Sequence, residues 1–198
     1  MKYVFRLFDG ELIETVLMKY EHGYTVCIST QVGCRMGCKF CASGINGLTR
    51  SLTASEMLAQ ITAVQRDNNI RVSNIVMMGM GEPLDNFDNS VRFLRLVSDE
   101  NGLNIGLRHI SLSTSGVVSG IKKLKEYNLP ITLSISLHAP SDDIRSSVMP
   151  VNKRWNIDEL LAACKEYQAV TTRRISFEYA LIDGVNNSDA CADMLAKK

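Results

Sequence analysis

Three cysteines lie close together in this chain, Cys34, Cys38 and Cys41, with the spacing C-x3-C-x2-C. Thiolates at this spacing can converge on one metal centre. A structural zinc site takes four protein ligands, and Cys27 or His22 could supply the fourth. A cubane iron–sulfur cluster takes one thiolate per iron, so three thiolates leave one iron open to a substrate. The spacing favours the cluster over zinc, and the neighbouring glycines place the triplet on a loop.

Four further segments with polar or glycine residues follow predicted strands: Gly79–Pro83, Ser113, Ser136–His138 and Asp183–Gly184. The glycines of the first segment let the backbone approach a ligand closely, and its acid, Glu82, can accept hydrogen bonds from an ammonium group. Each segment alone could be an ordinary turn or cap. All of them follow the same end of their strands, as does the cysteine loop, and parallel barrels assemble their sites at that end.

The elements that must position these residues alternate regularly between strand and helix. Strands are expected at 26–29, 74–78, 109–112, 131–137 and 175–181, and helices at 53–66, 88–97, 117–127, 156–167 and from 188 onward. Thr53 with Glu56, and Asn156 with Glu159, have the spacing of capping boxes, and Asp88 and Ser188 are expected to begin the other two capped helices. Such alternation predicts an α/β fold with a parallel sheet and helices outside.

The length predicts how much of a barrel the chain can form. A closed eight-unit barrel takes about 250 residues, and this chain has 198. We therefore expect a partial (β/α) barrel of about five βα units, preceded by a short N-terminal β-hairpin from residues 3–8 and 12–18. Residues 1–22 are expected to be strands flanking the barrel, and residues 23–198 its incomplete core.

Composition restricts the class of protein further. The chain has 22 Lys+Arg, 21 Asp+Glu and 45% hydrophobic residues, which is typical of a soluble globular domain and gives no basic excess for nucleic acid. No apolar run approaches the roughly 18 residues of a membrane span, and charged residues interrupt the N-terminal stretch where a signal peptide would be apolar. We expect a cytoplasmic protein with reduced thiols and no membrane partner. Arg35, Lys39 and Arg50 predict a positive rim on the cysteine loop.

The triplet, with the aromatic Phe40 just before its third cysteine, resembles the radical S-adenosylmethionine (SAM) superfamily. Further motifs resemble one of its branches, the radical SAM adenine-C2 methyltransferases of ribosomal and transfer RNA. These motifs are Gln31–Gly33, Gly79–Pro83, Leu112–Gly116, Ser136–Pro140 and Leu181–Asn186. The resemblance covers nearly the whole chain and implies a barrel of the radical SAM type, of which about five of six βα units are present.

The resemblance also implies two cofactors and a role for each site residue. Cys34, Cys38 and Cys41 would hold a [4Fe-4S] cluster. The residues that would contact SAM are Gly81, Glu82, Ser113, Ser136, Leu137 and His138. Glu14 matches the general base of the family, although a solvated acid on a strand is the simpler interpretation. Cys27 matches the cysteine that forms a transient disulfide with the covalent intermediate, although a small buried hydrophobic residue would also fit.

The reaction implied by the resemblance is methylation of adenine C2 in 23S rRNA and tRNA. A methyl group passes from one SAM to a cysteine, and a 5′-deoxyadenosyl radical from a second SAM activates that methyl for addition to the ring. The implied partners are these RNAs and an electron donor such as flavodoxin or ferredoxin, with the protein acting as a monomer.

Two departures from the family set the expectation for activity. Neither Cys164 nor Cys191 matches the motif of the methyl-carrying cysteine, and the helical accessory domain of the family has no counterpart. We therefore expect this chain alone to be inactive. The alternative is a non-catalytic module, steadied by zinc on Cys27 and the cysteine triplet, that binds RNA or protein; a different radical SAM reaction is a third hypothesis.

Overall fold

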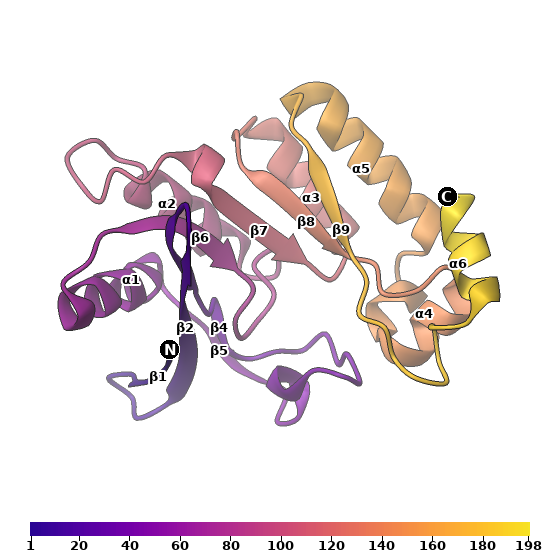
Figure 1. Cartoon of the computed structure of the whole chain (residues 1–198), viewed down its shortest axis with the longest axis horizontal. Coiled ribbons are helices and arrows are strands. Elements are labelled where there is room, and N and C mark those ends of the chain that lie inside the picture. Colours follow the sequence, from indigo (N-terminus) through magenta and orange to yellow (C-terminus); the bar gives the residue numbers. More distant parts are fainter.

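The computed structural model describes residues 1–198, in which five adjacent parallel strands make up most of a seven-stranded sheet. The parallel strands, in spatial order, are β3 (Gly23–Cys27), β6 (Val72–Met77), β7 (Ile110–Thr114), β8 (Thr132–Ser136) and β9 (Ile175–Glu178). The antiparallel hairpin of β1 (Lys2–Arg6) and β2 (Leu12–Tyr20) joins the sheet at the edge formed by β3. The predicted α/β fold, a partial barrel preceded by a hairpin, is confirmed (Figure 1).

The helices follow the parallel strands, as expected. They are α1 (Ala54–Asn68), α2 (Phe87–Val97), α3 (Val118–Glu126), α4 (Asp142–Val148), α5 (Ile157–Thr171) and α6 (Asp189–Ala196). Both predicted capping boxes are present, Thr53 with Glu56 at α1 and Asn156 with Glu159 at α5, each satisfying two backbone N–H groups. None of these helices combines the length and hydropathy that a membrane span requires.

The two faces of the sheet differ in chemistry. On one face, alternate residues of the parallel strands, such as Val26, Ile75 and Leu133, are fully buried, because this face packs against the helices. In Figure 1, α2 and α3 lie behind the strands. The strand register places polar and small residues on the opposite face, among them Ser111 and Ser134, whose hydroxyls are 2.9 Å apart. This second face leads directly to the strand ends where the site is expected.

The N-terminal hairpin is part of the same sheet as the barrel core. Its strand β2 pairs with β3 from Val16 opposite Cys27 to Tyr20 opposite Gly23. Gln60 of α1 fastens it further, since its side-chain oxygen accepts hydrogen bonds from the Thr15 hydroxyl (2.7 Å) and the Ser29 N–H (2.8 Å). The division into residues 1–22 and 23–198 stays a prediction.

Three local features differ from the sequence-based expectation. Residues around the cysteine loop form a second, two-stranded sheet of β4 (Gln31–Gly33) and β5 (Leu48–Ser51). The short helix α4 was not expected. Asn86, not Asp88, is the N-cap of α2, and Asp88 lies in its first turn, where a carboxylate favours the positive end of the helix dipole.

Candidate functional site

The cysteine loop is the connection between the two strands of the small sheet. β4 and β5 pair in antiparallel register, and the Cys34 N–H donates to the Gly47 carbonyl at 2.8 Å, which closes the loop at its base. Within the loop the backbone makes only short turns, including a 3-10 turn over Ala42–Gly44. The loop also contacts α4, because the Lys39 N–H donates to the Val148 carbonyl at 2.9 Å. The triplet is therefore held between two fixed points.

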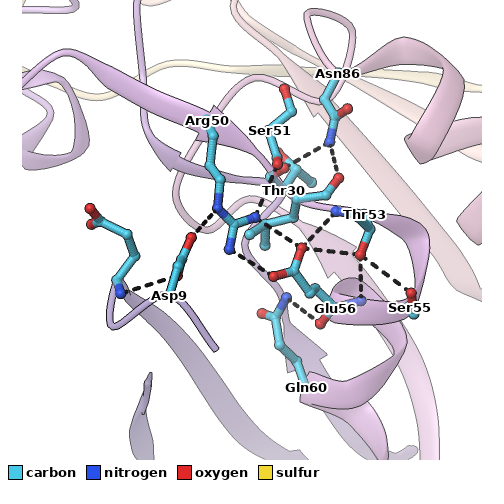
Figure 2. A network of polar contacts seen from close by, with 11 residues as sticks. Asp9, Thr30, Arg50, Ser51, Thr53, Ser55, Glu56, Gln60 and Asn86 are labelled. Atoms are coloured by element: carbon cyan, nitrogen blue, oxygen red, sulfur yellow. Dashed lines mark hydrogen bonds and ion pairs between the residues drawn. The ribbon is translucent and has the colours of Figure 1, made fainter. Parts of the chain in front are cut away.

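A polar network anchors the small sheet to the rest of the chain (Figure 2). The Arg50 guanidinium donates to Asp9 at 2.6 Å and to both carboxylate oxygens of Glu56 at 2.8 and 3.0 Å. Figure 2 also shows the Asn86 amide, which donates to the Thr30 carbonyl at 2.9 Å and to the Leu52 carbonyl at 2.7 Å. These contacts join segments from the hairpin, β5, α1 and α2 at the base of the cysteine loop.

The positive rim expected on the cysteine loop is not free, because both of its arginines are paired with acids. Arg50 is engaged by two carboxylates, and Arg35 donates to Asp85 at 2.9 Å. Their charges are therefore largely neutralised by neighbouring acids, and of the three expected cations only Lys39 forms no ion pair. A basic rim does not distinguish this loop.

The strand ends and the cysteine loop together enclose one cavity of about 170 Å³. All three cysteines of the triplet line it, and so do residues at the carboxyl ends of β6, β7, β8 and β9. The lining includes Cys34, Cys38, Cys41, Gly81, Glu82, Ser113, Ser136, His138 and Glu178. The structure thus brings together the three thiols and five of the six residues expected to contact SAM.

The segment after β6 reaches the cavity through a close backbone approach at Gly81. This residue has φ of 101°, and a Cβ added there would lie 2.5 Å from the Cβ of Gln31 and 2.7 Å from its backbone nitrogen. The Gln31 side-chain oxygen accepts the Glu82 N–H at 2.9 Å, so β4 and this segment are fixed to each other. Only glycine combines this backbone with this proximity.

Glu82 is a buried carboxylate at the cavity wall, only 3% exposed. One of its oxygens accepts the N–H and the hydroxyl of Ser115 at 2.7 and 2.8 Å, and the other accepts the Leu84 N–H at 3.1 Å. Burial raises the pKa of this carboxyl above its ordinary value, and the hydrogen bonds from Ser115 and Leu84 oppose the shift. Its remaining lone pairs could accept hydrogen bonds from a ligand in the cavity.

His138 lies at the end of β8 in a left-handed conformation with φ of 54°. Its Nδ1 accepts the Ala180 N–H at 2.9 Å, so Nε2 carries the proton in the neutral ring. Its ring meets Phe40 edge to face with centroids 5.1 Å apart. Burial lowers the pKa of His138 to about 4, with a smaller contribution from Arg145, and the neutral ring therefore offers one N–H donor near pH 7.

The thiols of the triplet influence one another. Burial, with smaller contributions from the neighbouring Cys34 and Cys41, raises the pKa of Cys38 to about 12; burial is also the main cause of the raised pKa of Cys34. No group of three His, Cys, Asp or Glu side chains has a geometry ready to hold a metal ion. The donor set still fits a metal: three sulfurs face one cavity, and a bound cation would favour their deprotonation.

Three expected site residues do not line the cavity. Leu137 is buried and reaches the opposite side of the sheet beside Leu161 and Phe177. Glu14 is exposed on β2 and forms an ion pair with Lys2 at 2.6 Å. Cys27 is half-buried on β3, and the register places it on the same face as Val16 and Val76.

The other cysteines and the candidate zinc ligand lie elsewhere. Cys164 is buried in α5 and Cys191 in α6, and all six cysteines are free thiols. His22 stacks on Tyr20 with centroids 5.2 Å apart and lines a different depression. Neither Cys27 nor His22, the expected fourth zinc ligands, therefore joins the triplet at the cavity.

Sequence reasoning missed two residues of the site. Glu178 ends β9, lines the cavity and lies opposite Ser136 in the strand register; burial raises its pKa, and the hydroxyls of Ser134 and Ser136 oppose the shift. Arg145 of α4 is fully buried behind the cavity wall. Glu178 could have been found as an acid at a strand end, but the sequence holds no signal for Arg145.

Comparison with protein families matches residues 28–195 to the radical SAM superfamily. The chain is similar to the probable dual-specificity RNA methyltransferases RlmN of Clostridium novyi (strain NT), at 54% identity over 196 residues, and of Alkaliphilus oremlandii (strain OhILAs), at 58% over 189 residues. These alignments cover 99% and 96% of this chain but 57% and 55% of the relatives. The chain therefore spans a little over half the length of the curated relatives it matches.

Comparison with solved structures agrees with this match to the radical SAM superfamily. A crystal structure of a radical SAM methyltransferase from Sphaerobacter thermophilus aligns with a TM-score of 0.95 and 52% identity, covering 99% of this chain and 58% of that one. The hydrogenase maturase HydG aligns with a TM-score of 0.54 over 76% of this chain and 33% of that one; at 16% identity this likeness concerns the fold alone.

Proposed function

We propose, from the premise that this chain belongs to the radical SAM superfamily, that it serves SAM-dependent methylation of adenine C2 in 23S rRNA and tRNA. The observation that carries the proposal is the shared cavity, in which three thiols meet the polar ends of four parallel strands. The similarity to RlmN-type RNA methyltransferases over nearly the whole chain supports the choice of an RNA substrate.

The triplet is the proposed holder of a [4Fe-4S] cluster. Cys34, Cys38 and Cys41 supply three sulfurs to one cavity, which is one fewer than the four irons of such a cluster require. When bound, the cluster supplies the single electron that radical chemistry at an unreactive ring carbon needs. The protein's own contribution is to hold the three thiols on a loop that is fastened at its base and at α4.

The strand ends are the proposed SAM site. Glu82 can accept hydrogen bonds from the ammonium group of SAM, since its carboxylate borders the cavity and retains free lone pairs. Gly81 keeps the wall clear of side-chain atoms at this point. Ser113 and Ser136 offer hydroxyl groups, and the neutral His138 offers one N–H donor. The proposed contact with Leu137 is limited to its backbone, because its side chain faces away.

The roles of Glu14 as general base and of Cys27 as partner in a transient disulfide remain part of the proposal. Cys27 lies on β3, which pairs with β6, and Glu14 lies on β2, one strand further from β6. The register places both on the sheet face that leads to the cavity, and neither lines it. We do not assign the methyl-carrying role to Cys164 or Cys191, because both are buried in helices away from the cavity. That these 198 residues alone methylate no RNA stays a prediction.

The partners follow from the same proposal. The RNA substrates, an electron donor such as flavodoxin or ferredoxin and action as a monomer are carried over from the family resemblance, and the proposed cytoplasmic location rests on the composition of the chain. The near-balanced charge of the chain, +1 at neutral pH, means that RNA affinity would depend on local contacts and not on a global basic excess.

Two measurements test the proposal. Anaerobic reconstitution with iron and sulfide should load about four irons per chain, and Cys34→Ser, Cys38→Ser or Cys41→Ser should each reduce loading, whereas Cys164→Ser should not. Tight zinc binding without iron uptake would contradict the cluster. For the substrate, mass spectrometry of RNA from cells that lack the gene should show loss of 2-methyladenosine, and an unchanged level would contradict the RNA assignment.

A further inference from the structure

Arg145 is a fully buried arginine whose charge no carboxylate meets directly. Its exposed fraction is 0%, and it forms no ion pair. Its guanidinium donates to the carbonyls of Ser115 (2.6 Å), Ser136 (3.0 Å) and Leu137 (3.0 Å), and to the side-chain oxygen of Asn152 (3.0 Å). It therefore joins the ends of β7 and β8, whose residues Ser115 and Ser136 line the cavity.

A single residue separates this buried cation from the buried anion of the site. Ser115 donates its N–H and hydroxyl to Glu82 at 2.7 and 2.8 Å, and its carbonyl accepts from Arg145 at 2.6 Å. On the other side, the Asn152 amide donates to the exposed Asp142 at 2.9 Å. Burying a charge without a direct partner is costly, and burial indeed lowers the pKa of Arg145 to about 10. The burial of this positive charge beside the cavity therefore calls for a physical explanation.

The cysteine loop packs against the same short helix. The Lys39 N–H donates to the Val148 carbonyl near the end of α4, and Gly37 lies against Pro150. Met149, four residues after Arg145, lines the cavity together with the three thiols. The guanidinium is thus fixed directly behind the wall of the cavity that the three thiols line.

We propose that Arg145 is a positioning residue that also supplies a fixed positive charge to the proposed cluster; this inference rests on the proposed function. A cubane cluster held by three thiolates is anionic in its oxidised form, and it gains one more negative charge when it accepts an electron. Net charge and hydrogen bonding around a cluster set its reduction potential, and a buried cation makes reduction more favourable. The same side chain keeps the ends of β7 and β8 in register around the cavity.

The experiment measures the midpoint potential of the reconstituted chain by EPR-monitored redox titration. The variants are Arg145→Gln, which removes the charge, and Arg145→Lys, which keeps it. The matched control is Arg154→Gln, because Arg154 is an exposed arginine of the neighbouring segment that stacks on Trp155 at 4.5 Å. Iron and sulfide are counted first in every sample. Wild-type protein that loads no cluster would overturn the proposed function, and this inference with it.

With the cluster loaded, we expect Arg145→Gln to make reduction about tenfold less favourable, which is a fall of about 59 mV for a one-electron couple. Arg145→Lys should restore most of the difference, and Arg154→Gln should match the wild type. Equal potentials in Arg145→Gln and the wild type would overturn the inference and leave the proposed function standing. A potential in Arg145→Lys as low as in Arg145→Gln would also overturn it, since the loss would then follow geometry and not charge.

A second pair of variants decides the question if Arg145→Gln does not fold. Asp142→Asn removes the carboxylate that reaches Arg145 through Asn152, and Asp143→Asn removes the adjacent exposed acid, which makes no such contact. The cluster should become easier to reduce in Asp142→Asn than in Asp143→Asn. Equal potentials in these two variants would overturn the inference.

Discussion

Replacement of Gly81 by alanine tests the close backbone approach on which the cavity wall depends. The added Cβ would lie 2.7 Å from the backbone nitrogen of Gln31 and 2.5 Å from its Cβ, and the residue would keep φ of 101°. A left-handed backbone costs an L-residue about 1–2 kcal/mol, and overpacking a well-packed site costs about 1–3 kcal/mol. We therefore expect Gly81→Ala to lower the free energy of unfolding by about 2–5 kcal/mol.

The matched control is Gly47→Ala in the cysteine loop. Gly47 also has positive φ, 70°, but nothing lies within 4 Å of an added Cβ, so only the backbone cost of about 1–2 kcal/mol applies. Urea unfolding, followed by circular dichroism and by the fluorescence of the single tryptophan, gives both values. If Gly81→Ala lowered the free energy of unfolding no more than Gly47→Ala does, the close approach of Gln31 would not contribute to the cost. This explanation of the cavity wall would then be wrong.

Three further predictions concern the chain without cofactors. Asn86→Ala should lower the free energy of unfolding by about 2–4 kcal/mol, because two buried carbonyls lose their hydrogen-bond donor. Asn101→Ala, at an exposed position, should change it by almost nothing. Equal losses in the two variants would contradict the role of the Asn86 amide. His138 should titrate near pH 4 in two-dimensional NMR, below its unfolded value of about 6.5. The unfolded chain then binds this proton more tightly than the folded chain does. The free energy of unfolding should therefore fall as the pH drops from about 6.5 to about 4, and His138→Gln should lessen that fall. A titration midpoint at 6.5 or above would refute this prediction. With its pKa raised to about 12, Cys38 should react with iodoacetamide about a thousandfold more slowly near pH 8 when folded than in urea, which is roughly the ratio of the two thiolate fractions; equal rates would refute it.

The sequence was sufficient for features that depend on local spacing. Capping boxes at Thr53 and Asn156 fixed the starts of two helices because both partners lie within one turn. The five parallel strands followed from their alternation with helices. The convergence of Glu82, Ser113 and His138 on one cavity followed from the rule that the carboxyl ends of parallel strands meet at one edge.

Features that depend on distant partners could not be predicted in this way. Arg50 was expected on a free basic rim, but its acids come from the hairpin turn, at Asp9, and from the next helix, at Glu56. Helix α4 has seven residues, too few to show a helical period, so Arg145 had no predicted element. Leu137 was expected at the cavity with its neighbours Ser136 and His138, but its side chain lies on the other side of the sheet.

The most direct test of the central claim is an EPR measurement of the reduced, reconstituted chain with and without SAM. Three protein thiolates, from Cys34, Cys38 and Cys41, leave one iron of the proposed cluster for SAM, so adding SAM should change the spectrum, and Glu82→Gln should weaken that response. A spectrum that is indifferent to SAM, or a cluster whose fourth iron is bound by a protein side chain, would contradict the account.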